Sequence, residues 1–110
     1  MPDSIGDLKS IKKLDLSHNR FTELPESIGN LKSLEELYVH DNYWLAGLPE
    51  SIGGLSSLRI LDARMNGMTR IPETIGELNE LRGLFLSGNQ LSQLPESIKD
   101  LKWLRTLDIN

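Results

Sequence analysis

The chain has 110 residues, enough for one domain, and a formal net charge of -4. This mild negative charge gives no electrostatic reason to expect nucleic acid or an anionic membrane as a partner. The absence of cysteine excludes disulfides and cysteine-ligated metals, and no apolar run is long enough for a signal peptide or a transmembrane helix. We therefore expect a cytoplasmic protein.

Five copies of the phrase Pro-Asp/Glu-Ser/Thr-Ile follow one another along the chain. Successive copies are 23, 24, 23 and 23 residues apart, and they begin at Pro2, Pro25, Pro49, Pro72 and Pro95. A period of this size is typical of a solenoid, in which each repeat buries its apolar face against its neighbours. Proline favours the start of a helical turn and the following glycine favours its end, which predicts a short helical or 3₁₀ turn in each repeat. Lys99 replaces that glycine in the fifth copy.

A second phrase, of the form Leu-x-x-Leu-x-Leu-x-x-Asn, recurs in the same phase. It covers residues 11–19, 34–42, 58–66 and 81–89, and a fifth copy that begins at Leu104 is cut off at Asn110. The alternation predicts a short strand in each repeat, and strands one repeat apart can only pair in parallel, about 4.8 Å from each other. An amide offers both donors and an acceptor to a turn, so we expect a structural role for the column Asn19, Asn42, Asn66 and Asn89.

The remaining apolar columns are predicted to point inward as layers of one core. They comprise Phe21, Leu45, Met68 and Leu91; Leu24, Leu48, Ile71 and Leu94; Ile5, Ile28, Ile52, Ile75 and Ile98; and Leu8, Leu31, Leu55, Leu78 and Leu101. Together the columns predict an α/β solenoid, a right-handed horseshoe segment. A parallel sheet of about five short strands would line its concave face, and short helical or 3₁₀ turns its convex face.

The second phrase resembles the motif of leucine-rich repeats, and Leu-Pro-x-x-Ile-Gly-x-Leu is similar to their 23-residue intracellular Ras-group type. Two stretches, residues 61–66 and the loop at 42–49, resemble passages of the plant intracellular Ras-group-related family. The resemblance implies a scaffold or regulator that binds other proteins, among them small GTPases or signalling proteins. It supplies no catalytic residues.

Residues 1–110 are predicted to form a single leucine-rich-repeat domain without a polar cap at either end. We expect a fragment of a longer protein; the alternative is a small structural or self-assembling unit that covers its ends as a homo-oligomer. The first coil around Ile5, Leu8 and Ile11 and the edge strand from Leu104 are the candidate contacts for self-association.

A candidate binding patch lies on the predicted concave face, where residues between the strand leucines point into the curve. Aromatic residues and arginine dominate binding energy at interfaces. The alternative is that the aromatic residues reflect strand propensity and that one Asp–Arg pair is a surface contact worth under about 1 kcal/mol. The patch consists of Tyr38, His40, Ile60, Asp62, Arg64 and Phe85.

Three further aromatic residues are loop or edge candidates for binding. The second repeat has one extra residue, which places Tyr43 and Trp44 in a loop beside the predicted face. Trp44 either folds back over the adjacent coil or stands out as an anchor. Trp103 occupies a column that is polar in the other repeats, so it packs against a following repeat or contacts a second copy.

A metal or acid–base site on the concave face is geometrically conceivable, because His18 and His40 lie on neighbouring strands near Asp15, Asp41 and Asp62. Nothing beyond proximity supports it. The sequence contains no glycine-rich phosphate loop and no nucleophile elbow, and scattered carboxylates beside two histidines are usual for a solvated face. We therefore expect no enzymatic activity, no metal and no cofactor, and a protein as the partner.

Overall fold

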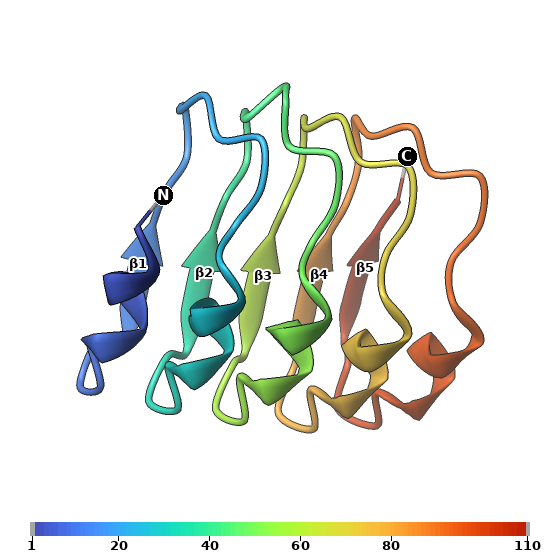
Figure 1. Cartoon of the computed structure of the whole chain (residues 1–110). Coiled ribbons are helices and arrows are strands. Elements are labelled where there is room, and N and C mark those ends of the chain that lie inside the picture. Colours follow the sequence, from blue (N-terminus) through green and yellow to red (C-terminus); the bar gives the residue numbers. More distant parts are fainter. Residues whose placement is uncertain (1, 110) are drawn as a thin grey trace.

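The computed structural model describes residues 2–109, so Asn110, which ends the fifth copy, lies outside it. The chain forms five coils stacked side by side, with a strand on one face and a 3₁₀ turn on the other (Figure 1). The strands are β1 (Lys13–Asp15), β2 (Glu36–Tyr38), β3 (Ile60–Asp62), β4 (Gly83–Phe85) and β5 (Thr106–Asp108). The 3₁₀ turns are η1 (Asp3–Asp7), η2 (Glu26–Asn30), η3 (Glu50–Gly54), η4 (Glu73–Glu77) and η5 (Glu96–Asp100).

The strands form one parallel sheet in the order β1-β2-β3-β4-β5. Each residue pairs with its counterpart one repeat later, so Leu37 lies opposite Leu14 on one side and Leu61 on the other. This register confirms the predicted sheet of five short parallel strands. Within residues 2–109 no helix has both the length and the apolar character needed to cross a membrane.

The 3₁₀ turns are joined by a second set of bonds between repeats. The hydroxyl of Ser27 donates to the Asp3 carbonyl at 2.6 Å, and Ser97 repeats this contact with Glu73 at 2.7 Å. A hydroxyl at this position therefore satisfies a carbonyl of the preceding turn, which explains why the repeated phrase carries serine or threonine. Ser51 departs from the pattern, since its buried hydroxyl has no partner among the described residues.

The glycine of each turn allows close contact with the next coil. A Cβ atom on Gly76 would lie 2.6 Å from the Ser97 carbonyl oxygen, and one on Gly53 would lie 2.7 Å from that of Thr74. Such distances are too short for any side chain, so the close stacking of the turns requires glycine. The fifth copy has Lys99 at this position, and within residues 2–109 no coil packs on that side of η5.

The apolar columns form one continuous core, as predicted, and its central residues Ile28, Leu55 and Leu61 are completely buried. The first coil is an exception. Leu8 belongs to an inward-facing column, yet it is 46% exposed because η1 has a neighbouring coil on one side only. Leu8 therefore keeps its place in the inward-facing column, but within the described residues it is covered from one side only.

The asparagine column forms a ladder at the point where the chain leaves each strand. The side chain of Asn42 accepts a hydrogen bond from the Asn19 backbone N–H at 3.1 Å and donates to the carbonyls of Leu16 and Val39. Its own N–H donates to the side-chain oxygen of Asn66 at 2.7 Å. Asn89 completes the ladder through the carbonyl of residue 63 and the N–H of residue 68. The predicted structural role of this column is confirmed.

Replacing Asn42 with alanine should lower the free energy of unfolding by about 3 kcal/mol, because it leaves several buried backbone groups without partners. The matched control is Asn19→Ala, since Asn19 is exposed and water can replace its contacts; we expect a loss of about 1 kcal/mol. Urea denaturation followed by circular dichroism measures both. Equal losses of unfolding free energy in the two variants would show that the contribution of these asparagines does not depend on their burial.

Replacing Gly76 with alanine should destabilise the chain by about 2 kcal/mol, because the new Cβ forces η4 away from η5. Lys99→Ala alters the same column where no coil covers it and should change stability by less than about 0.5 kcal/mol. Thermal melting of the two variants tests the contrast. A Gly76→Ala variant as stable as the original chain would show that η4 can move away from η5 without a loss of stability.

Candidate protein-binding surface

The three central strands bring the predicted patch together on the concave face. In the sheet register, Asp62 lies opposite Tyr38 on one side and Phe85 on the other, and Ile60 lies opposite Gly83. We call Tyr38, His40, Ile60, Asp62, Arg64 and Phe85 the strand surface. Four of the six lie in β2, β3 and β4, and His40 and Arg64 lie two residues beyond the ends of β2 and β3.

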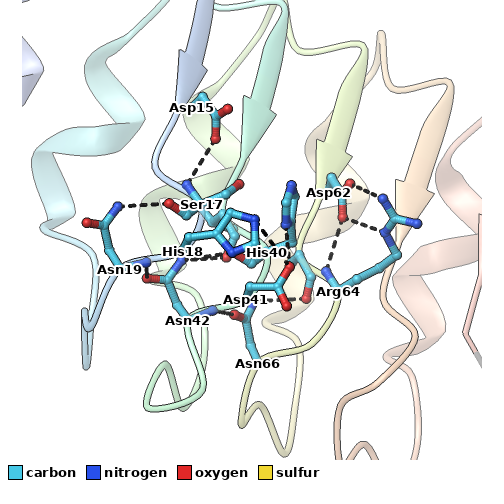
Figure 2. A network of polar contacts seen from close by, with 12 residues as sticks. Asp15, Ser17, His18, Asn19, His40, Asp41, Asn42, Asp62, Arg64 and Asn66 are labelled. Atoms are coloured by element: carbon cyan, nitrogen blue, oxygen red, sulfur yellow. Dashed lines mark hydrogen bonds and ion pairs between the residues drawn. The ribbon is translucent and has the colours of Figure 1, made fainter.

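Asp62 holds Arg64 in one orientation. The Arg64 guanidinium donates through Nε and Nη2 to the two carboxylate oxygens of Asp62, at 2.9 and 2.7 Å (Figure 2). The Asp62 side chain is only 5% exposed, whereas that of Arg64 is 44% exposed. Such a bidentate pair, with its carboxylate buried, differs from the exposed surface pair that the sequence left open. Asp62 therefore positions Arg64, and Arg64 is the member that a partner can reach.

Phe85 lies beside Arg64 and next to Gly83. The Arg64 guanidinium carbon is 5.6 Å from the centre of the Phe85 ring, within the range of a cation–π contact. The ring covers Gly83, where a Cβ atom would lie 2.9 Å from Phe85 Cε2. Sequence reasoning missed the role of Gly83, and the only available signal was a glycine inside a strand.

Tyr38 is fixed by its neighbours on β1 and β2. Its hydroxyl donates to Glu36 at 2.6 Å, and the Lys13 ammonium lies 5.6 Å from the centre of its ring. The hydrogen bond to the Glu36 carboxylate, together with partial burial, raises the pKa of Tyr38 to about 12. The aromatic side chains on the strand surface thus have defined positions without a partner.

A polar cluster lies next to the strand surface, where β1 and β2 end (Figure 2). His40 Nδ1 and Asp41 Oδ2 are 2.7 Å apart, and this hydrogen bond from His40 lowers the pKa of Asp41. The backbone N–H of Ser17 lowers the pKa of Asp15 in the same way. An open hollow of about 320 Å³ adjoins the cluster and is lined by His40, Asp41, Arg64, Met65 and Ser87.

The exposed aromatic residues lie outside the sheet. Tyr43 is 61% exposed and Trp44 is 69% exposed, so Trp44 stands out from the loop and does not fold back over the adjacent coil. Trp103 is 59% exposed, in agreement with its predicted surface position. Met65 is 43% exposed at the edge of the hollow. The sequence did not single out Met65, because the equivalent positions in the other repeats hold unrelated residue types.

A row of arginines directly precedes three of the strands. The backbone N–H of Arg82 donates to the Arg59 carbonyl, and that of Arg105 donates to Arg82, each at 2.8 Å. No described carboxylate lies within ion-pair distance of these three guanidinium groups. In the repeat alignment this column reads Lys12, Glu35, Arg59, Arg82 and Arg105, so it is basic in every repeat except the second, a signal that the sequence reasoning overlooked.

Family models match the chain in two places. Residues 2–43 match one leucine-rich repeat model, and residues 80–101 match a second. The chain is a leucine-rich repeat domain. The fold is typical of protein-interaction scaffolds and not of enzymes. Among curated proteins no match was found.

Three solved structures are similar to the leucine-rich repeat domain over 100% of its length. A leucine-rich repeat protein of Leptospira interrogans is 41% identical, with a TM-score of 0.95. The plant peptide hormone receptor RGFR1 in complex with RGF2 is 34% identical, with a TM-score of 0.88, and PEPR1 with AtPEP1 is 35% identical, with a TM-score of 0.91. The domain spans 28%, 18% and 16% of those chains, respectively.

Replacing Glu36 with glutamine should lower the pKa of Tyr38 from about 12 towards its ordinary value near 10, because the neutral amide no longer disfavours the phenolate. A raised pKa means that the folded state keeps the proton longer than the unfolded state. The stabilising contribution is therefore complete below pH 10 and is lost as the pH rises to about 12. Near-ultraviolet titration in a Tyr43→Phe background isolates Tyr38. An identical titration with and without Glu36 would contradict the contact.

Proposed function

We propose that the leucine-rich repeat domain binds an extended peptide, or an extended segment of a protein partner, on the strand surface. The observation that carries this proposal is the fixed orientation of Arg64, held by Asp62 on one side and facing the Phe85 ring on the other. An arginine that is already ordered loses little side-chain entropy on binding, so more of its interaction energy appears as affinity. Tyr38 and Phe85 add aromatic area of the kind that dominates interfaces.

The charges around the strand surface favour a particular peptide. Arg59, Arg82 and Arg105 form a cationic row at the start of the strands, without carboxylate partners among the described residues. A peptide that combines an apolar side chain over Phe85 with acidic residues over this row would complement both features. Two of the similar structures are complexes that support this proposal: the plant peptide hormone receptor RGFR1 with RGF2, and PEPR1 with AtPEP1.

We further propose a signalling role for the domain in the cytoplasm. A role as a signalling scaffold or regulator, with a small GTPase or another signalling protein as partner, rests on the resemblance to the Ras-group type of repeat. Residence in the cytoplasm rests on the absence of cysteine from the sequence.

Self-association through the end coils is the second candidate function. Trp103, Leu107 and Ile109 favour it, because they are 59%, 39% and 51% exposed on the coil of β5. Lys99 opposes a second copy that would repeat the internal stacking, since it occupies the place where the turns need glycine. The strand surface is therefore the preferred binding site.

A displayed library of random peptides, selected against the domain, provides ligands for a direct test. The variant with Tyr38, Arg64 and Phe85 all replaced by alanine should lose binding to the selected peptides by at least about a hundredfold, since each anchor contributes about 1–2 kcal/mol. Calorimetry measures the affinity, and circular dichroism and melting verify that the variant is folded.

The control variant carries Arg70→Ala and Trp103→Ala, which remove an exposed arginine and an exposed aromatic residue outside the strand surface. It should bind the selected peptides like the unchanged domain. Peptides that bind the triple variant with undiminished affinity would exclude the strand surface as the binding site.

A further inference from the structure

Three side chains with metal-ligating atoms meet where β1 and β2 end: His18, His40 and Asp41 (Figure 2). Asp41 Oδ2 lies 2.7 Å from His40 Nδ1 and 3.9 Å from His18 Nε2. One nitrogen or oxygen atom from each residue lies within 4.8 Å of the other two. In residues 2–109 this is the one place where three such side chains come so close.

The backbone, and not the side-chain contact, brings these residues together. His18 and Asp41 occupy the same column of the repeat, and both have left-handed conformations with φ of 59° and 60°. The His18 N–H donates to the His40 carbonyl at 3.1 Å, and the Asp41 N–H donates to the Arg64 carbonyl at 3.0 Å. These bonds continue the pattern of the sheet beyond the strands, so the positions of the three residues are set before any ion binds.

The distances suit a small ion that prefers nitrogen and carboxylate ligands. Atoms bound to a tetrahedral zinc ion at 2.0–2.1 Å are about 3.4 Å from one another, and the two observed separations, 2.7 and 3.9 Å, lie on either side of this value. Small side-chain rotations reach it, and the His18 side chain, which is 72% exposed, has room to turn. We propose that His18, His40 and Asp41 bind a divalent transition-metal ion such as Zn²⁺, with water completing the coordination.

The surroundings of the cluster favour a cation. The Tyr43 hydroxyl donates to Asp41 Oδ1 at 3.3 Å, which orients the carboxylate and leaves Oδ2 for the ion. Arg64 lines the same hollow, but its guanidinium is paired with Asp62 and does not act as an uncompensated positive charge.

An ordinary hydrogen bond is the competing explanation. His40 and Asp41 form a good hydrogen bond by themselves, and His18 packs edge to face against His40 with ring centres 5.2 Å apart. This explanation assigns no ligating role to His18. The two accounts therefore differ in what the loss of His18 does to metal binding.

Titration of the chelator-treated domain with ZnCl₂ tests the proposal. Calorimetry should give one ion per chain, and the melting temperature should rise with zinc because the ion binds the folded state. His18→Asn, His40→Gln and Asp41→Asn should each weaken zinc binding by at least about tenfold. Asparagine tolerates the left-handed backbone at positions 18 and 41, and melting without zinc shows that each variant is folded.

Asp15→Asn is the matched control, because it removes a neighbouring carboxylate that is not one of the three ligands. It should retain zinc binding, and the visible spectrum of the Co²⁺ form should show nitrogen and oxygen coordination that is lost in His18→Asn. Two results would overturn the proposal: an unchanged melting temperature of the original domain in excess zinc, or zinc affinity in His18→Asn equal to that of the original domain.

Discussion

The parallel backbone ladder is the constraint on which the rest of the molecule depends. Each strand pairs in register with its counterpart one repeat later, so equivalent residues lie one strand spacing apart, about 4.8 Å. On the opposite face, hydroxyl-to-carbonyl hydrogen bonds and close contacts at glycine hold the 3₁₀ turns of neighbouring repeats in a matching stack. A residue type that recurs in one column therefore becomes a row in space. The asparagine ladder and the arginine row both follow from this rule.

The same ladder creates one unusual backbone position in each of four repeats. The residue before the column asparagine is left-handed, and it is His18, Asp41, Met65 or Gly88. Glycine avoids a cost of about 1–2 kcal/mol that other residues pay there, and Gly88 also leaves space for Met65, which a Cβ atom would contact. The fold fixes the conformation at this position but not the side chain. Ligating groups can therefore occupy the first two copies of the column without disturbing the stack.

The repeat period was sufficient to predict the course of the backbone, because residues in one column of the repeat alignment occupy equivalent positions in successive coils. It placed the strands, the 3₁₀ turns and the asparagine ladder correctly. Features that depend on side-chain conformation could not be predicted in this way. The burial of Asp62 depends on the orientation of Arg64, and the role of Gly83 depends on how the Phe85 ring lies. The exposure of Leu8 shows that a column gives the direction of a side chain but not how many coils cover it.

The metal cluster and the strand surface share an edge, since His40 and Arg64 occupy the same column in neighbouring repeats and line one hollow. A bound divalent ion would place two positive charges beside a guanidinium whose own charge is offset by Asp62. The open coordination positions of the ion bind carboxylate oxygens, and the guanidinium of an arginine donates hydrogen bonds to the same kind of oxygen. A peptide carboxylate at this edge would therefore gain from both groups, while its apolar side chains lie over Phe85. The ion would then act as a selector for acidic peptides, and the aromatic contacts would supply affinity that does not depend on it.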